Sequence, residues 1–477
     1  MYFALNALKS KAFHVVNLTI FCSKWYNRSG FNAKAERSCL ILKKLISLFV
    51  ILAIILSCCG AGADIVSATS TDPNANRNIK IQPAGVNPWP TDGTSPTTGR
   101  NFADLEDQLE EGFGGMTLTG EYYPIMVQHC GYAGGVGIAA PFYGSYADVY
   151  YEMAKSQTGH TRMCMVFNDF LPTYAGGSRS MRVGYLYIRQ EWNCPLLFHG
   201  RQNADGPTDV TKAAAALGIP SSLGSGVGTT IPWSEIMLFD SLAGSKKWLA
   251  YKYRVLNRDD ECNVIWDLPG IRNNLLGERS YEDHNHTWKF GELPEGGDNA
   301  ETVYVLFKNN AAKQLDEGKK LYFYYNSMYQ YDEDENVYYR YMMDELENPD
   351  NNAHLFEEQI ITAATIKRSN RNGESQGCTM DAIISYGEPI TFANVIVQYI
   401  DMSWNYGGER PLPTLLGTGN ADYFMGGKHY VGVWNREKYD DRTVFYGEDG
   451  QEIALQPGRT MIVMMDYKTA NREVKFE

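Results

Sequence analysis

The sequence predicts an α/β (α+β) fold, in which an N-terminal βαβ-type layered domain is followed by a strand-rich C-terminal domain. Strand and helix patterns alternate between residues 122 and 217, as expected for a sheet that helices cover. Past residue 320, apolar runs rich in Val, Ile and Tyr are separated by turn residues, which is typical of antiparallel strands. At 477 residues the chain exceeds what one hydrophobic core usually supports, so two domains are expected, at 118–290 and 300–470.

The N-terminal half supplies the alternation of strands and helices. Ser180 is the expected cap of the first helix, and Gly218 is expected to end the second. Residues 145–154 fit a helix or a strand equally well. Strands are predicted at 123–127, 161–167 and 196–198, and helices at 180–192 and 208–217.

The C-terminal half is predicted to consist mainly of strands. Two Tyr-rich runs, 321–331 and 337–343, flank the acidic residues 332–336 and therefore predict a hairpin with an acidic tip. A β-branched run at 394–400 predicts a further strand. A meander is expected to follow, with strands at 428–436, 443–446, 452–455 and 460–465 and with turns at Glu448-Asp449-Gly450 and Pro457-Gly458.

The net charge of −13 is unevenly distributed. Eight Lys and Arg against one acidic residue give residues 1–58 a charge of +7, so the remainder carries −20. An acidic body of this kind repels a phosphate backbone, so no nucleic-acid partner is expected.

An export signal explains the basic N-terminal region. Lys43-Lys44 is followed by an apolar or small run from 45 to 56 and then by Ser57-Cys58-Cys59-Gly60. Twelve residues at 1.5 Å each are too short to cross a hydrocarbon core of about 30 Å. The segment at 43–59 resembles a bacterial lipoprotein signal peptide with Cys58 or Cys59 as the lipidated residue, although ordinary cleavage and an uncleaved anchor remain alternatives. The predicted location is the extracytoplasmic face of the cell membrane, with a lipid anchor.

Two segments around this signal are excluded from the folded body. Residues 1–42 precede the signal and are interpreted as an extension from a misread upstream start. Residues 60–117 are rich in Asn, Pro, Thr, Ser, Gly and Asp, so they are predicted to form a flexible polar tether.

The cysteines of the body predict neither a zinc site nor a disulfide framework. They are odd in number, lie far apart and contain no Cys-x-x-Cys pair, so they are interpreted as small buried hydrophobic residues. These are Cys130, Cys164, Cys194, Cys262 and Cys378.

Arg162, Arg179 and Arg182 are the most distinctive candidates for chemistry in this acidic body. Guanidinium groups bind carboxylates and phosphates through two parallel hydrogen bonds, and two of these arginines lie at the predicted start of a helix, which itself favours an anion. The alternative is an internal ion pair with Glu152 and Asp148, which is the more frequent fate of a buried arginine.

Other motifs give weaker signals. The segment Glu282-Asp283-His284-Asn285-His286 puts two histidines on one face of a strand, but no third ligand can be assigned, so no metal is predicted. The glycine-rich segments lack the other residues of a P-loop or a dinucleotide fingerprint, so no cofactor is predicted. No recognised catalytic constellation is present in the sequence, and the enzyme question stays open with a leaning towards a non-enzyme.

Several of these segments together resemble the YerB family. The family comprises lipoproteins of Gram-positive bacteria with N-terminal and C-terminal domains of unknown function, so the resemblance implies a location and a fold but no activity. Two departures are Asp283-His284-Asn285, where the family has Pro-His-Asn, and Arg201-Gln202 after His199-Gly200, where it tends towards Gly-Gly-Ser. The matching segments are Ala147-Asp148-Val149-Tyr150-Tyr151-Glu152, Thr161-Arg162, Arg179-Ser180-Met181-Arg182, His199-Gly200, Tyr339-Arg340, Asn394-Val395-Ile396-Val397, Gly417-Thr418-Gly419, Gly427-Lys428 and Trp434.

Three functional hypotheses follow. The first is a non-enzymatic lipoprotein that binds a small anionic ligand, a cell-wall-derived ligand or a partner protein. The second is a hydrolase of wall polymers with His199 or His284 as acid or base and Glu152 as its partner. The third is a scaffold that makes contact through the hairpin around Tyr329 and Tyr338. The ligand-binding residues predicted for the first hypothesis are Glu152, Arg162, Arg179, Arg182, His199, His284, Asn285 and Arg340.

Overall fold

The computed structural model divides the chain into two units, Met1–Val66 and Ser67–Glu477. All residues described below belong to the second unit. No helix in these described ranges is both long and apolar enough to cross a bilayer. The structure describes residues 68–85, 87, 90–106, 117–118, 124–133, 137–138, 140–202, 206–218, 250–256, 262–276, 287–307, 310–317, 326–342, 354–367, 378–406, 410–468 and 472–477.

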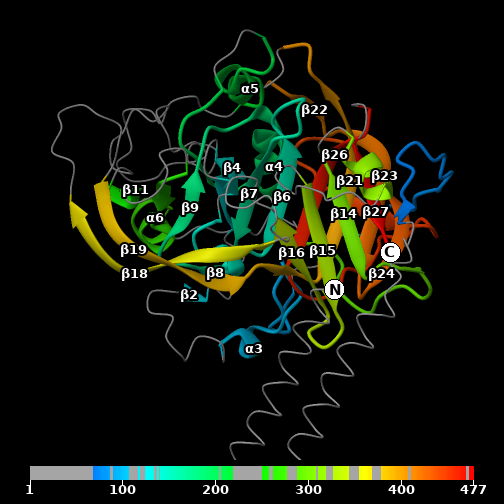
Figure 1. Ribbon diagram of the computed structural model, residues 1–477, viewed down its shortest axis with the longest axis horizontal. Helices are drawn as coiled ribbons and strands as arrows, with labels where there is room; N and C mark the ends of the chain where they lie inside the picture. The colour runs from blue at the N-terminus through cyan, green and yellow to red at the C-terminus, as the bar shows by residue number, and fades with distance from the viewer. Residues whose placement is uncertain are drawn as a thin grey trace, which may run out of the picture. The chain divides into compact units, whose positions relative to one another are not determined.

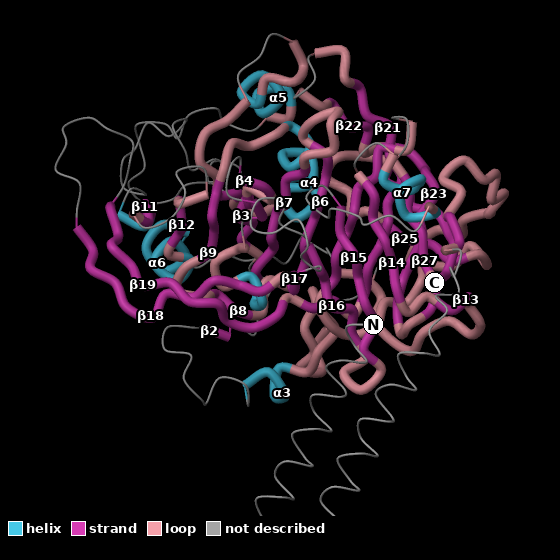
Figure 2. The backbone as a smooth tube through the Cα atoms, viewed as in Figure 1, coloured by secondary structure: helices cyan, strands magenta, loops and turns pink. Residues whose placement is uncertain are grey.

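The largest sheet in the described part of the chain runs in the order β10-β3-β7-β6-β26-β21-β23-β24-β13, with β22 beside β21 and β25 beside β24. Strands β7 and β26 are buried along their whole length, so both faces of the sheet are covered there. The mixed, strand-rich fold predicted from the sequence is confirmed (Figures 1 and 2). The strands are β3 (Ile125–His129), β6 (Val149–Ala154), β7 (Thr161–Phe167), β10 (Leu196–Leu197), β13 (Asp298–Asn299), β21 (Asn394–Ser403), β22 (Leu412–Thr414), β23 (Gly417–Met425), β24 (Lys428–Arg436), β25 (Val444–Gly447) and β26 (Thr460–Asp466).

Strands from both halves of the chain share this sheet. β26 lies between β6 and β21 and is parallel to both, as the red and cyan strands of Figure 1 show. The prediction that β26 closes a C-terminal meander was therefore wrong. Its residues are apolar on both faces, which suits a central strand with parallel neighbours and not the exposed edge of a meander.

Two further sheets pack with the largest one. The second runs in the order β1-β27-β14-β15-β16-β17, with β20 beside β16, and the third runs β18-β19-β11-β12-β9. A hydrophobic cluster that includes Val395, Val463, Val303 and Phe476 joins the largest sheet to the second. These strands are β1 (Thr69–Ser70), β9 (Ala175–Ser178), β11 (Lys252–Val255), β12 (Val264–Trp266), β14 (Thr302–Leu306), β15 (Asn326–Asp332), β16 (Val337–Met342), β17 (His354–Leu355), β18 (Glu357–Lys367), β19 (Cys378–Pro389), β20 (Thr391–Phe392) and β27 (Glu473–Phe476). Two short pairs complete the strands, β2 (Thr117–Leu118) with β8 (Phe170–Leu171) and β4 (Tyr132–Ala133) with β5 (Gly137–Ile138).

The principal helices lie close to their predicted positions. α4 buries Leu186 and Trp192 in a hydrophobic cluster with the largest sheet, and α5 packs beside it. Ser180 is not the cap of α4, because that helix begins after Arg182, whose side chain makes no capping hydrogen bond. The helices are α3 (Phe102–Glu106), α4 (Val183–Trp192), α5 (Val210–Ala216), α6 (Leu268–Ile271), α7 (Ala311–Asp316), and the short η2 (Gly144–Tyr146) and η5 (Arg272–Leu276).

Most individual strand predictions are confirmed. The strand predicted at 161–167 is β7, the strand predicted at 428–436 is β24, and the predicted hairpin is β15–β16. The ambiguous segment at 145–154 resolves into η2 followed by β6. The strand predicted at 452–455 was wrong, because this segment makes isolated bridges and forms no ladder.

The described residues between 68 and 106 lie against the body, so the prediction of a flexible tether was wrong there. β1 pairs with the C-terminal strand β27, and the amide of Gln82 donates to the carbonyl of Gly450. Side chains such as Arg77, which contacts Asp422 at 3.0 Å, replace the hydrophobic burial that the composition of this segment lacks.

A pair of buried aspartates holds this N-terminal segment. The hydroxyl of Thr97 lies 2.7 Å from Asp148 Oδ2 and 3.1 Å from Asp169 Oδ1, and Ser95 and Thr98 each donate to Asp169 at 2.6 Å. Burial, followed by repulsion from Asp169, raises the pKa of the Asp148 carboxyl well above its ordinary value. Asp148 thus accepts a hydrogen bond from this N-terminal segment, whereas the sequence had suggested an ion pair between Asp148 and the arginines at 162, 179 and 182.

Glu152 and Arg340 form an ion pair inside the core. Arg340 Nη2 lies 2.8 Å from Glu152 Oε2, and both side chains are at most 2% exposed. Thr161 donates to the other carboxylate oxygen, and the guanidinium lies over the ring of Phe356 at 4.7 Å. Although burial disfavours its charge, the Glu152 carboxylate raises the pKa of Arg340 above its ordinary value. Both residues were predicted to bind a ligand, and in the structure they instead form an ion pair with each other between two sheets.

A disulfide joins Cys130 and Cys262, whose Cα atoms are 6.0 Å apart. The prediction that the cysteines of the body are buried is confirmed for all five, with Cys164, Cys194 and Cys378 as buried thiols, but the prediction that they form no disulfide was wrong for Cys130 and Cys262. The pair was missed because its partners are 132 residues apart and only the tertiary fold brings them together.

Removal of this disulfide is expected to destabilise the protein. The double variant Cys130→Ala/Cys262→Ala should lose about 2–4 kcal/mol of unfolding free energy, because the crosslink restricts the unfolded chain. Guanidinium unfolding with and without reductant measures the effect. Wild-type protein treated with reductant should match the double variant, and an unchanged midpoint on reduction would contradict a stabilising disulfide.

Breaking the buried ion pair should be costly as well. Arg340→Ala is expected to lower the free energy of unfolding by about 3–5 kcal/mol, because it leaves the Glu152 carboxylate buried without its cation. The matched variant Glu152→Leu/Arg340→Met removes both charges and should regain most of that stability in urea unfolding. An Arg340→Ala protein as stable as the wild type would show that the pair is not desolvated.

Candidate functional site

Five basic residues lie on neighbouring segments of the described chain, and we call them the basic cluster. The loop after β10 lies beside the segment between β9 and α4, and two backbone hydrogen bonds join them. The amide of Met181 donates to the Gly200 carbonyl at 3.0 Å, and the amide of His199 donates to the Arg179 carbonyl at 3.3 Å. The five residues lie near the start of β7, directly after β9, directly before α4, shortly after β10 and in β11, respectively, in the order in which they are named next. The members are Arg162, Arg179, Arg182, His199 and Arg254.

Arg162 and Arg182 form the buried part of the cluster, with 4% and 9% exposure. Arg182 precedes α4, and its Nη1 donates to the carbonyls of Ser180 and Met181. The hydroxyl of Tyr185, in the first turn of α4, donates to the carbonyl of Arg162, which attaches β7 to that helix. The structure thus brings together two arginines predicted from sequence positions twenty residues apart.

Arg179 and His199 form the half-buried, more accessible part. His199 Nε2 lies 3.2 Å from Nη2 of Arg254, and Nη1 of Arg254 donates to Asn263 at 2.9 Å. Sequence reasoning missed Arg254, because it lies in a short strand with no distinguishing motif. Asn263 adjoins Cys262, so the disulfide lies next to the residue that positions Arg254.

The remaining predicted residues do not join this cluster. Glu152 and Arg340 lie in the core ion pair. His284 and Asn285 lie outside the described residues, as do Cys58 and Cys59. Within the described ranges, no three His, Cys, Asp or Glu side chains are grouped as a metal site.

The hairpin proposed as a scaffold surface is not exposed at the residues chosen for that role. Tyr329 and Tyr338 are both 0% exposed, and the hydroxyl of Tyr338 donates to the Ala300 carbonyl. The alternation of strands β15 and β16 turns these two rings into the core, so the prediction that they form a contact surface was wrong.

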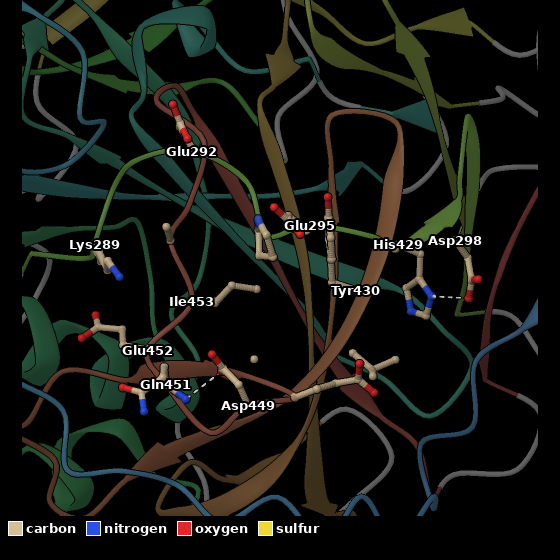
Figure 3. Close-up of a pocket in the computed structure, with 16 residues that line it drawn as sticks. Lys289, Glu292, Glu295, Asp298, His429, Tyr430, Asp449, Gln451, Glu452 and Ile453 are labelled. Carbon is tan, nitrogen blue, oxygen red and sulfur yellow. Dashed lines mark hydrogen bonds and ion pairs between the residues drawn. The ribbon is translucent and has the colours of Figure 1, made fainter.

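A second feature, the acidic cleft, lies at the opposite end of the largest sheet. The segment before β13, strand β24 and the turn after β25 form its walls, and its volume is about 750 Å³ (Figure 3). Sequence reasoning missed this cleft, because its carboxylates come from segments 150 residues apart in the chain. Its charged lining consists of Glu292, Glu295, Asp298, Glu448, Asp449, Glu452, Lys289 and His429.

Comparisons with known proteins agree with the resemblance expected from the sequence. Residues 373–462 match the family model described as the C-terminal domain of DUF3048, a protein of unknown function. The crystal structure of the YerB protein from Bacillus subtilis is similar with 16% sequence identity and a TM-score of 0.49, over 78% of this chain and 96% of that chain. No curated protein matches the sequence. The resemblance expected from the sequence is thereby confirmed, in that residues 373–462 are similar to the C-terminal domain of DUF3048, whose function is unknown.

Proposed function

We propose that this protein is a lipid-anchored, extracytoplasmic binding protein whose basic cluster takes a small anionic or cell-wall-derived ligand. The observation that carries the proposal is the convergence of four arginines and a histidine in a body with a net charge of −20. In such a chain, cations gathered from separate elements favour an anion at that place.

The chemistry of the cluster suits carboxylate or phosphate. Planar guanidinium groups bind either anion through two parallel hydrogen bonds. α4 starts beside Arg182 without a side-chain cap, so the amides of its first turn add positive potential. The half-buried Arg179 and His199 give the site a solvent-facing side through which a ligand can enter.

Two features support the proposed location. The signal-like segment at 43–59 ends in the Cys58-Cys59 pair, which fits lipidation. The Cys130–Cys262 disulfide is the kind of bond that persists outside the reducing cytoplasm.

Ligand binding is tested by thermal unfolding of the full chain with inorganic phosphate and with a muropeptide. A bound ligand at a hundred times its dissociation constant should stabilise the protein by about 2.7 kcal/mol. The Arg179→Gln variant should lose this stabilisation, because Arg179 is a half-buried member of the cluster. Lys313→Gln is the matched control, since Lys313 is an exposed cation on α7. An equal effect of ligand on Arg179→Gln, or no effect of either probe on the wild type, would refute the site.

Lipidation is tested by metabolic labelling of the full chain with palmitate. The double variant Cys58→Ser/Cys59→Ser should lose the label and leave the membrane fraction, whereas Cys39→Ser should keep both. The two single variants identify the modified cysteine. Label retained in the double variant would exclude the proposed anchor.

A further inference from the structure

The acidic cleft carries more carboxylates than its neighbouring cations neutralise. Glu452 is paired with Arg442, whose Nη1 and Nη2 lie 2.5 and 2.8 Å from its two oxygens. Among the lining residues, Lys289 is the one lysine or arginine. Five carboxylates remain, those of Glu292, Glu295, Asp298, Glu448 and Asp449.

His429 gives a second and independent indication of a ligand. Its side chain is 7% exposed, and its Nε2 lies 2.8 Å from Oδ1 of Asp422, a carboxylate that Arg77 also contacts. Its Nδ1 is buried without a hydrogen-bond partner in the described part of the chain. Asp298 Oδ2 lies 4.0 Å from this Nδ1, a contact at ion-pair distance that Figure 3 marks with a dashed line but that is too long for a hydrogen bond.

Two acceptors, His429 Nδ1 and the Asp298 carboxylate, face each other without a donor from the described residues between them. A carboxylate only accepts hydrogen bonds, so Nε2 of His429 donates to Asp422, and a ring that carries this one proton leaves Nδ1 as an acceptor. Asp298 is likewise an acceptor, and a donor placed between it and Nδ1 would satisfy both groups. A buried acceptor left without a donor is destabilising, so the site gains stability from a ligand with N–H groups.

The size and the walls of the cleft favour an organic cation over a metal ion. A volume of about 750 Å³ falls in the range of small-molecule sites and is far larger than one ion needs. No group of three metal-binding side chains occurs in the described ranges. Tyr430, Val431 and Ile453 also line the cleft, and a tyrosine ring and aliphatic side chains suit the methylene chain and the charge of an alkyl ammonium.

We propose that the acidic cleft binds an organic cation with two or more ammonium groups, one of which donates to His429 Nδ1 and Asp298. The other ammonium group pairs with a further carboxylate of the lining, on Glu295 or on the turn at Glu448 and Asp449. This site is separate from the basic cluster and does not depend on its function.

Isothermal titration of the full chain with spermidine tests the proposal. One spermidine should bind per chain, and the double variant Glu295→Gln/Asp298→Asn should bind about tenfold more weakly, because two charge-assisted contacts are lost. The matched control Glu333→Gln/Asp334→Asn removes two exposed charges from the tip of the β15–β16 hairpin and should bind as the wild type does. Spermidine acetylated at both terminal amines should not bind.

Three results would overturn the proposal. Absence of heat with wild-type protein would exclude a polyamine site. Equal weakening in the control variant would show diffuse attraction to the acidic body. Calcium ions binding with the same dependence on Glu295 and Asp298 and displacing spermidine would show that the cleft takes a metal ion instead.

Discussion

The fold depends on the insertion of β26 between β6 and β21. These three strands are parallel, although β6 comes from the first third of the chain and the other two from the last. Parallel pairing requires long crossover connections, so the chain has to return from its C-terminal region to complete a sheet begun more than three hundred residues earlier. The insertion of β26 therefore positions the Glu152–Arg340 pair and the N-terminal segment. It also positions the basic cluster and the acidic cleft at the two ends of the sheet.

Polar contacts attach those segments of the chain that bury little hydrophobic surface. The segment from 68 to 106 contains few apolar residues, and it is held by β1, by Arg77 and by the hydroxyls around Asp169. The disulfide acts in the same way beside the basic cluster, where it joins Cys130, directly after β3, to Cys262, shortly before β12. Buried polar groups of this kind are favourable only when their hydrogen bonds are complete, which makes these attachments specific.

Local features of the fold could be read from the sequence, and distant pairings could not. β7 and β24 have the predicted bounds, because a buried apolar run and a glycine-bounded strand are local signals. The place of β26 was missed, since its apolar residues indicate a buried strand but do not show which strands lie beside it. The arginines at 162, 179 and 182 were predicted from residue type and, for two of them, from their place at a predicted helix start. Arg254 and the acidic cleft were not, because only tertiary contacts give those residues their neighbours.

The order of strands in the largest sheet also separates charge. The basic cluster lies at the end formed by β10, β3 and β7, and the acidic cleft at the end formed by β24 and β13. The first and last strands are eight intervals apart, which corresponds to roughly 38 Å at the usual strand spacing. Charges of opposite sign at the two ends of one sheet contribute a separation of charge along its strand order. The same strand order that builds the core therefore also keeps the arginines of the basic cluster and the carboxylates of the acidic cleft far apart.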